Sequence, residues 1–383
     1  MNTLEHLERL IAFDTISHKS NLALISYVED LLRRKNIHFE RFMDETGEKA
    51  NLFATIGPVD REGVILSAHS DVVPVEGQNW NRNPFKLTRE NDRFFGRGTT
   101  DMKGFLASCL ALIERINPEN LTIPIHLALS HDEETGCVGA RTLVQALKKQ
   151  GLRARFCIVG EPTSMDVAIG HKGRLGAKAK FQGVGGHSAM APHFLNPIYM
   201  AGEFIDILRQ TQAQIVGEKA RDHLYEIPYT TLHIGTISSG VATNVVPRHC
   251  LMDFEIRNIS QNDADSILQD MMKQYQTLLN MYREKFADAD LEVSIVSQYP
   301  GFETEQDHDV VKMMLKMAGD TKVTKVPYGT EAGLFAHYLN VPTVVCGPGS
   351  MDQGHTPDEF IELEQLIRCD EMLERLHLSI SRV

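Results

Sequence analysis

Short apolar runs that stop at polar or glycine residues recur through the first half of the chain. They lie at 64–66, 123–129 and 156–159. Runs of this length, bounded in this way, are typical of buried β-strands. Between them, apolar positions return at helical spacing in 105–116, and a further helical segment at 136–150 stops at Gly151, as helices commonly do. This alternation predicts a sheet with helices on both faces.

A different pattern begins at about residue 176. The expected elements are a strand, a helix, two strands, a helix and a strand, at 177–181, 197–212, 230–238, 250–257, 262–286 and 292–296. This β-α-β-β-α-β order is that of a small ferredoxin-like domain. The apolar run 341–346 then repeats the pattern of short buried strands seen in the first half of the chain. We therefore predict a mixed-sheet α/β domain built from residues 1–175 and 299–383, with a ferredoxin-like domain inserted at 176–298.

Composition and charge narrow the class of protein. The 383 residues are enough for two domains, and 42% apolar with 23% charged residues is typical of a globular protein. The formal net charge of −12 argues against a nucleic-acid-binding face, which would be basic. Apolar runs stay short of the roughly eighteen residues that span a membrane, and the first residues predict an amphipathic helix rather than a signal peptide. We expect a cytoplasmic protein without nucleic-acid or membrane partners.

The cysteines limit the chemistry of any metal site. The six are scattered, without a Cys-x-x-Cys pair, at positions 109, 137, 157, 250, 346 and 369. This arrangement is typical of a reduced intracellular protein and not of a disulfide framework or a zinc–thiolate site. A metal ion in this protein would therefore need histidine and carboxylate ligands.

Polar side chains gather just beyond the predicted strand ends and helix starts of the α/β part. They are His69, Asp101, Glu133, Glu134, Glu161 and His355. If the strands are parallel, all these segments end at the same edge of the sheet, where such sheets bind ligands. Carboxylates gathered there would repel one another unless a cation offset their charge. Two divalent ions against three ligand carboxylates leave a net charge of +1, which a bridging hydroxide neutralises. The mixed histidine and carboxylate set suits zinc, cobalt or manganese.

Glu133 is the carboxylate that this ligand set leaves over. Paired ions about 3.5–4 Å apart are a known arrangement for activating water against an amide. A free carboxylate beside them could take the proton from the water and pass it to the leaving amine. Asp71 follows His69 at a spacing that lets its carboxylate hold the other nitrogen of the His69 ring.

Each of these residues also has a simpler interpretation. A lone histidine after a strand is usually structural, Asp101 could be a helix N-cap, and Glu161 before a proline could belong to a turn. Glu133 and Glu134 could be a solvated acidic pair at a helix start, where they complement the helix dipole. All of these simpler interpretations would have to be true at once, for residues at successive strand ends of one sheet. The pattern therefore favours a metal site.

Five motifs then occur in a specific order along nearly the whole chain. They are His69-Ser-Asp71, Gly98-Thr-Thr-Asp-Met-Lys-Gly104, Asp132-Glu-Glu-Thr135, Gly160-Glu-Pro-Thr163 and Gly185-Gly-His-Ser188. The combination resembles the two-zinc aminoacylase and deacylase metallopeptidases. The resemblance implies that His69 and Glu161 hold one zinc ion, that Glu134 and His355 hold the other, and that Asp101 bridges them. It also implies that Asp71 orients His69 and that Glu133 is the general base.

The resemblance also assigns roles to the inserted domain. In this family that domain acts as a lid and makes a homodimer contact. Its glycine-rich motif would place His187 in the partner's active site, where it stabilises the tetrahedral oxyanion. Arg257 would bind the substrate carboxylate, and Asn244 would contact substrate from a lid loop. Taken alone, His187 is a histidine in a glycine-rich turn and Arg257 a surface strand residue. His171 and His193 match no family role, and we expect them to be structural.

Three further segments indicate the substrate, a small N-acyl amino acid. They are Gly329-Thr-Glu-Ala332, Gly347-Pro-Gly-Ser350 and His355-Thr-Pro-Asp-Glu359. They resemble family members that remove acetate from N2-acetyl-L-ornithine in arginine biosynthesis, and Glu331 is then available to pair with the ornithine ammonium. The alternatives are another hydrolase of the same fold, such as a succinyl-diaminopimelate desuccinylase or a dipeptidase, and a metal- or amino-acid-binding protein without catalysis. The intact Glu133 argues against the last, because a binding protein needs no free base beside its ligands.

Overall fold

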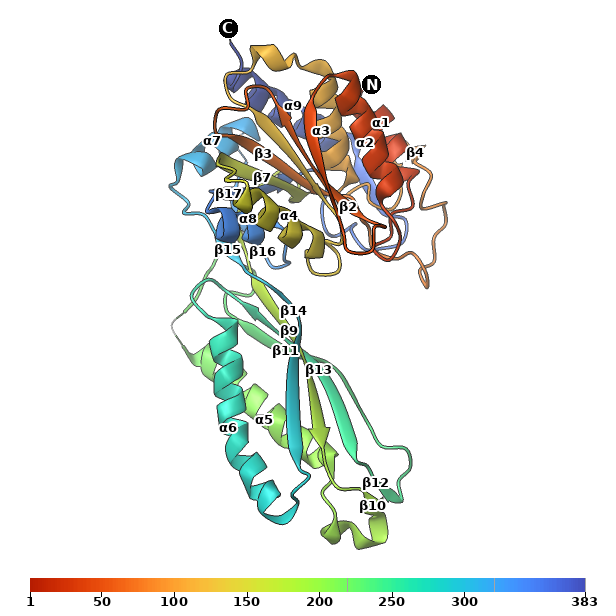
Figure 1. Ribbon diagram of the computed structural model, residues 1–383, viewed down its shortest axis with the longest axis vertical. Helices are drawn as coiled ribbons and strands as arrows, with labels where there is room; N and C mark the ends of the chain where they lie inside the picture. Colours follow the sequence, from red (N-terminus) through yellow and green to blue (C-terminus); the bar gives the residue numbers. More distant parts are fainter. Residues whose placement is uncertain (219, 320, 383) are drawn as a thin grey trace. The chain divides into compact units, whose positions relative to one another are not determined.

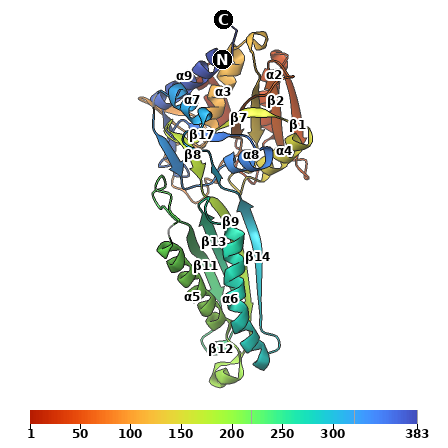
Figure 2. The ribbon, with the colours of Figure 1, turned by 90° about the vertical axis from the view of Figure 1, so that its left-hand side faces the viewer.

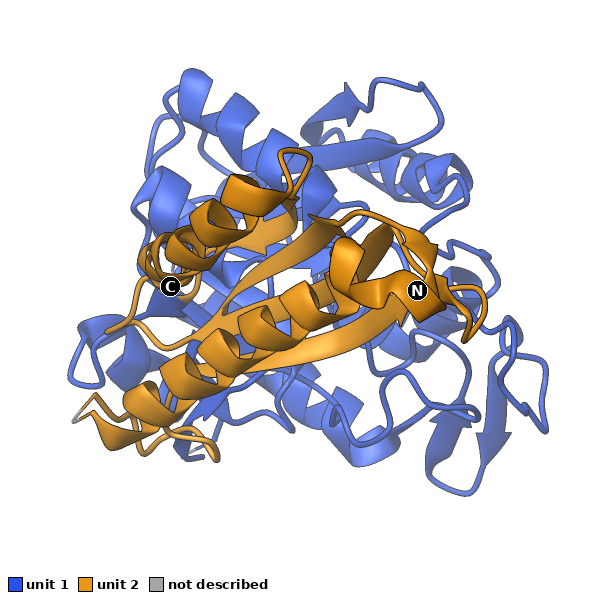
Figure 3. Ribbon diagram, turned by 90° about the horizontal axis from the view of Figure 1, so that it is seen from below, with its two compact units in different colours: residues 1–171, 302–383 blue, residues 172–301 orange. Residues whose placement is uncertain are grey.

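The chain folds into two compact units (Figure 3). The structure is a computed structural model that describes residues 1–218, 220–319 and 321–382. Unit 1 consists of residues 1–171 and 302–383, and unit 2 of residues 172–301. The sequence places the same two junctions at 175/176 and 298/299, within four residues of those in the structure.

Unit 1 is built on a nine-stranded mixed sheet (Figure 1). Its order is β1-β2-β6-β3-β7-β17-β8-β15, with β16 beside β8. The strands are β1 (His38–Met43), β2 (Ala50–Ile56), β3 (Gly63–His69), β6 (Ile125–Ser130), β7 (Ala154–Pro162), β8 (Val167–His171), β15 (Phe302–Glu303), β16 (Val323–Val326) and β17 (Thr343–Gly347). The central strands β6, β3, β7 and β17 are parallel, whereas β1, β2 and β15 pair antiparallel. The predicted mixed sheet is confirmed.

Helices cover both faces of this sheet (Figures 1 and 2). One apolar core contains side chains of α1 (Thr3–Ile11), α2 (Leu22–Arg34), α3 (Lys103–Arg115), α7 (Asp309–Met317) and α9 (Leu363–Ser379). The opposite core contains side chains of α4 (Val138–Lys149) and α8 (Ala332–Leu339). Successive side chains of a strand point to opposite faces. Val64 and Leu66 therefore enter the first core and Ile65 the second, which explains why the run is apolar throughout.

A small antiparallel sheet lies beside the main one in unit 1. Its order is β18-β5-β4, formed by β4 (Thr88–Glu90), β5 (Arg93–Phe95) and β18 (Phe360–Glu362). Phe95 pairs with Phe360, so the chain before residue 97 runs beside the chain after residue 359. This pairing brings two segments together that are far apart in the sequence. The remaining element of this unit is the short helix η1 (Pro118–Asn120).

Unit 2 has the predicted β-α-β-β-α-β order. Its strands β9 (Gly173–Gln182), β11 (Thr231–Ser239), β13 (His249–Asn258) and β14 (Asp290–Tyr299) form an antiparallel sheet in the order β11-β13-β9-β14. The helices α5 (Pro197–Gly217) and α6 (Ala264–Lys285) share one apolar core with this sheet. A small hairpin of β10 (Gly186–His187) and β12 (Val245–Val246), with the short helix η2 (Ser188–His193), is added to the predicted elements.

Two further findings concern the cysteines and the length of the helices. All six cysteines are free and buried, as their scattered positions predict. Among the helices that the structure describes, none combines the length and the apolar character needed to cross a lipid bilayer.

Candidate metal centre

The six candidate residues meet at one edge of the unit 1 sheet, and five of them end or follow a strand of that sheet. His69 is the last residue of β3, and Glu161 is the penultimate residue of β7. Glu133 and Glu134 follow the end of β6 at Ser130, and His355 lies in the loop after β17. Because β3, β6, β7 and β17 run parallel, their carboxyl ends meet at this edge. Asp101 joins them from the turn before α3.

Asp101 lies between the two imidazoles. Its Oδ1 atom is 3.0 Å from His69 Nε2, and its Oδ2 atom is 3.0 Å from His355 Nε2. Glu134 Oε2 is also 3.0 Å from His355 Nε2, and Glu161 Oε1 is 3.7 Å from His69 Nε2. One carboxylate thus offers one oxygen to each half of the site, as the bridging role of Asp101 requires.

Potential donor atoms of the candidate residues are close enough to share a cation. Those of His69, Glu133 and Glu161 all lie within 4.8 Å of one another, and so do those of His69, Asp101 and Glu134. Glu161 Oε1 is buried and has no hydrogen-bond partner among the described residues. An unpaired buried carboxylate oxygen is costly unless a cation binds it.

The pKa values of the ionisable groups in the site also favour a bound cation. Burial raises the pKa of Glu161 well above its ordinary value, and the nearby charges of Asp101 and Glu133 raise it further. Burial and the charge of Asp101 raise the pKa of Glu134 to about 7. Hydrogen bonds to Asp101 and Glu134 raise the pKa of His355 to about 10. Carboxylates this basic, set against imidazoles, are the donor set that binds divalent cations, so the residues fit a metal.

The simpler interpretations of the ligand residues do not hold. Asp101 is not an N-cap, because α3 begins at Lys103 with Met102 at the cap position and no side-chain cap bond. Glu133 and Glu134 are not in a first helical turn, because α4 begins only at Val138. Glu161 lies within β7 rather than in a turn.

Glu133 stands next to the ligands in a turn that Asp71 holds. The Asp71 Oδ1 atom accepts the backbone N–H of Glu133 at 3.1 Å, and Oδ2 that of Glu134 at 3.3 Å. The Cys137 thiol donates to Glu133 Oε1 at 3.3 Å. Burial, together with the charge of Glu134, raises the pKa of Glu133 well above its ordinary value, although the charge of His69 opposes this.

Asp71 contacts His69 differently from the predicted arrangement. The His69 Nδ1 atom is 2.9 Å from the backbone carbonyl oxygen of Asp71, whereas the carboxylate oxygen Oδ1 is 3.6 Å away. The carboxylate instead accepts the two backbone amides and the Ser17 hydroxyl, at 2.7 Å. Ser17 was not among the predicted residues, and nothing in its sequence context indicates this contact.

Glu331 is buried beneath the same edge, with 1% of its surface exposed. The Ser67 hydroxyl donates to Glu331 Oε2 at 2.8 Å, and the Ser130 hydroxyl donates to Oε1. Both carboxylate oxygens are therefore engaged by side chains of β3 and β6. His171 is buried nearby and accepts the backbone N–H of Gly333 at 3.2 Å. That contact supports the first turn of α8, as a structural histidine would.

The remaining predicted residues belong to unit 2. His187 is exposed and pairs with Val245 across the β10–β12 hairpin, and the Ser188 backbone N–H bonds to the Asn244 carbonyl at 3.0 Å. His187 and Asn244 are therefore neighbours, and Asn244 is exposed as well. His193 is exposed at the end of η2.

Arg257 lies at the other end of the unit 2 sheet. It pairs with Arg174 at the start of β9, whereas His249 pairs with Gln182 at the end of β9 that leads to His187. Eight residues of β13 separate the two ends, which is about 25 Å at the rise of a strand. The Arg257 Nε atom bonds to Glu255 Oε1 at 2.8 Å.

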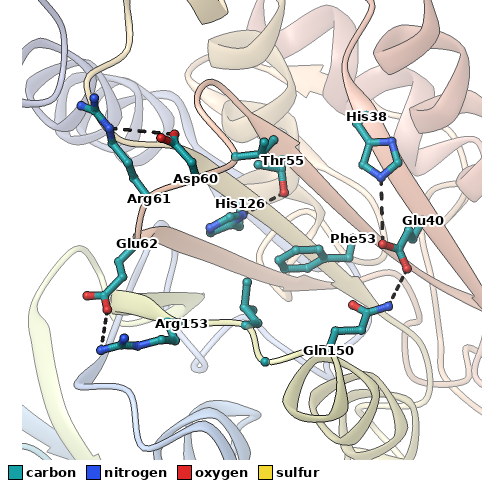
Figure 4. A pocket seen from close by; sticks show the side chains of 13 residues that line it. His38, Glu40, Phe53, Thr55, Asp60, Arg61, Glu62, His126, Gln150 and Arg153 are labelled. Carbon is teal, nitrogen blue, oxygen red and sulfur yellow. Dashed lines mark hydrogen bonds and ion pairs between the residues drawn. The ribbon is translucent and has the colours of Figure 1, made fainter.

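A hollow on the surface of unit 1, away from the candidate metal centre, contains none of the predicted residues (Figure 4). It is lined by Thr55, His126 and Arg153, among others, near the opposite ends of the strands that carry the candidate ligands. Its rim is closed by paired side chains, with Glu62 2.8 Å from Arg153 and Gln150 bonded to Glu40 at 2.8 Å. The candidate metal ligands and Glu133 lie at the other edge of the sheet.

Comparison with known proteins settles the family. The profile of Peptidase family M20/M25/M40 matches residues 65–379. The chain belongs to this family. This M20 member is 32% identical to an acetylornithine deacetylase from Pasteurella multocida, over 97% of the chain and 96% of the relative. It is 34% identical to an acetylornithine deacetylase from Myxococcus xanthus, over 96% of the chain and 95% of the relative.

A solved M20 structure shares the fold. It is a dinuclear metal-binding peptidase from Bacillus subtilis, 15% identical, with a TM-score of 0.71 over 99% of this chain and 97% of that one. The predicted resemblance to metallopeptidases is confirmed, and the chain is a hydrolase of the M20 family.

Proposed function

We propose that this M20 hydrolase removes the acetyl group from the N2 atom of N2-acetyl-L-ornithine, giving L-ornithine and acetate in arginine biosynthesis. The observation that carries the proposal is the identity of 32–34% over at least 95% of the chain to relatives called acetylornithine deacetylase. The unit 1 residues that the reaction needs stand together at one edge of the sheet. A cytoplasmic location belongs to the same proposal and is supported by the six free cysteines.

We propose two divalent ions, zinc in the first place, with cobalt or manganese able to replace it. His69 and Glu161 would hold one ion and His355 and Glu134 the other, with one oxygen of Asp101 on each. Bound there, the pair supplies Lewis acidity to the scissile amide. The unpaired Glu161 oxygen and the basic carboxylates support this assignment.

Glu133 moves the proton in this proposal. It takes a proton from the attacking water and returns it to the amine that leaves as ornithine. A base used in this way needs a fixed position and a pKa above that of an ordinary carboxyl. Asp71 fixes the backbone of Glu133, the Cys137 thiol holds Oε1, and burial raises the Glu133 pKa.

Glu331 is proposed to recognise the ornithine ammonium group. Its carboxylate is buried close to Glu133, and the two serine hydroxyls fix its orientation. The Glu331→Gln variant keeps the shape and removes the charge. We expect kcat/KM for N2-acetyl-L-ornithine to fall by about 100-fold or more, because a buried ammonium group would lose its ionic partner. Unchanged turnover would remove Glu331 from the substrate site.

We further propose that the enzyme is a homodimer and that His187 acts in the partner's site. Arg257 and His187 are both proposed to contact one small substrate. Arg257 lies at one end of the β9–β13 pair, and the other end, about 25 Å away, leads to the separate β10–β12 hairpin that carries His187. One chain therefore cannot supply both residues to one substrate. The edge strand β11 supports self-association, because Ile237 and the residues beside it are exposed. Arg257 would bind the substrate carboxylate, and Asn244 would contact substrate beside His187.

The deciding experiment measures metal content and hydrolysis on the purified chain. We expect two metal ions per chain, turnover of N2-acetyl-L-ornithine, loss of turnover with a chelator and its return with Zn²⁺. A panel of N-succinyl-diaminopimelate, dipeptides and other N-acetyl amino acids tests specificity. Comparable kcat/KM on the succinyl substrate or on dipeptides would replace this proposal with a neighbouring activity, and metal binding without hydrolysis would favour a binding protein.

A further inference from the structure

We infer that a hydrogen-bonded trio, the buried Glu359 and Arg97 and the half-buried Gln78, positions Asp101 and His355 and so controls the affinity of the metal site with His355 more than that of the other. The inference rests on the proposed metal centre and adds to it three positioning residues, which touch no ligand side chain. Each lies close in the sequence to a predicted segment. Gln78 follows the first motif, Arg97 precedes Gly98, and Glu359 ends the segment that begins with His355.

Glu359 holds the turn that presents Asp101. Its Oε1 atom accepts the backbone N–H groups of Thr100 at 2.9 Å and of Asp101 at 3.2 Å. Its Oε2 atom accepts the N–H of Gly98 at 3.0 Å, and its backbone carbonyl accepts that of Gly96 at 2.9 Å. One residue from the His355 segment thus takes four amides of the Asp101 segment, and only 1% of its own surface is exposed.

Arg97 connects this carboxylate to the backbone of His355. Its Nη1 atom donates to Glu359 Oε2 at 2.6 Å, and its Nη2 atom donates to Gln78 Oε1 at 2.5 Å. The Gln78 amide then donates to the carbonyl oxygen of His355 at 3.0 Å. The Arg97 guanidinium also lies over the Trp80 ring, 5.0 Å from its centroid. Asp101 and His355 are therefore fixed by one connected set of bonds.

The trio should support one metal site more than the other, because the proposed ligand residues differ in how their backbone is held. His69 and Glu161 lie in β3 and β7, where ladder hydrogen bonds to neighbouring strands already fix the backbone. Asp101 and His355 lie in turns outside any strand or helix. Their position depends on contacts between loops, and the trio supplies these. His355 belongs to only one of the two proposed ligand sets, so loosening its segment should weaken that site more than the other.

The test is a Co²⁺ titration of the chelator-treated full chain, followed by the visible absorption of the bound ion and by calorimetry. Two variants probe the trio. Gln78→Met, at a half-buried position, removes the hydrogen bond to the His355 carbonyl. Glu359→Gln removes the negative charge that accepts the backbone N–H groups of the Asp101 segment. Glu29→Gln is the matched control. Glu29 is equally buried and bonds to Arg41 at 2.6 Å, but it lies on α2 beside β1.

We expect the wild type and Glu29→Gln to bind two Co²⁺ ions alike. Gln78→Met should bind one ion as the wild type does and the second about 10- to 100-fold more weakly, with a changed absorption spectrum. Glu359→Gln should weaken the binding of both ions, because Asp101 belongs to both ligand sets, and that of the second ion more. Two unchanged sites in Gln78→Met would overturn this inference, and so would an equal weakening in Glu29→Gln. A wild-type chain that takes up no Co²⁺ would instead overturn the proposed metal centre itself.

Discussion

At the scale of single residues, Asp71 and Cys137 hold Glu133 beside the ligands without sharing the role of a ligand. The Asp71 carboxylate accepts the backbone amides of both Glu133 and Glu134, so a proposed base and a proposed ligand share one anchor. The Asp71 carbonyl meanwhile bonds to the ring of His69. One residue thus fixes the relative position of three groups that the reaction needs together.

The Glu133→Gln variant tests the proposed base. The amide keeps the shape of the side chain and cannot take a proton, so kcat should fall by about 10²- to 10⁴-fold while the metal content stays at two ions per chain. Glu364→Gln, which alters an exposed acid in the first turn of α9, is the control and should retain full activity. Retention of wild-type kcat by Glu133→Gln would assign the proton transfer to another group.

The clustering of the proposed ligand residues could be predicted from the sequence, but the contacts around them could not. Glu134 and His355 follow the carboxyl ends of parallel strands, which meet at one edge, and Asp101 precedes a helix that packs on the same sheet. The role of the Asp71 carboxylate depends on a difference of less than 1 Å between two acceptors of one residue. Glu359 lies in a quoted segment, yet its four amide partners are set by a loop far away in the sequence. Spacing carries no signal for such contacts.

At the scale of secondary structure, β6 connects the ligand edge with the opposite hollow. It ends at Ser130, which bonds to Glu331, and near its start His126 stacks on Phe53 with ring centroids 5.2 Å apart. The His126 Nδ1 atom is 3.0 Å from the Thr55 hydroxyl, and its Nε2 atom is buried without a partner among the described residues. A neutral imidazole suits this position, whereas a charged one would lack solvation.

This burial predicts acid sensitivity. Burial lowers the pKa of His126 from 6.5 to about 4 in the folded chain. Between these values the unfolded chain binds a proton that the folded chain does not, so the free energy of unfolding falls as pH drops below 6.5. From pH 7 to pH 4.5 this residue should remove about 2.5 kcal/mol.

Urea denaturation at the two pH values measures this loss. A His126→Gln variant should lose about 2.5 kcal/mol less than the wild type between pH 7 and pH 4.5. His38→Gln, which alters an exposed histidine at the same hollow, should follow the wild type. Equal losses in the wild type and His126→Gln would show that His126 is not kept neutral by the fold.

Elements with strong periodicity were predicted, and the shortest ones were not. The helix at 105–116 is α3 at 103–115, and the βαββαβ order of unit 2 appears as expected. The strands β4, β5 and β16 have three or four residues and largely lack the alternation of buried and exposed positions. Their pairing comes from tertiary contacts, as in Phe95 with Phe360, which local sequence does not encode.

At the scale of the whole molecule, the placement of His187 and Arg257 within one unit carries the dimer proposal. The β9–β13 pair, about 25 Å long between the end with Arg257 and the end that leads to His187, keeps the two from one amino acid, so the proposal assigns one of them to a second chain. The proposal also assigns a use to the exposed edge of β11, which pairs with β13 on one side only. A symmetric dimer would use the same edge in both chains.

Mixing two inactive variants tests whether His187 acts across the dimer. Glu133→Ala lacks the base and His187→Ala lacks the oxyanion donor, so each homodimer should be nearly inactive. Random exchange makes half of the dimers hybrids, and each hybrid has one site with Glu133 from one chain and His187 from the other. Activity should therefore return to about a quarter of the wild-type value. Light scattering must show a mass of two chains before and after mixing. If His187 served its own chain, neither chain of a hybrid would have both residues, and the mixture would stay as inactive as its components.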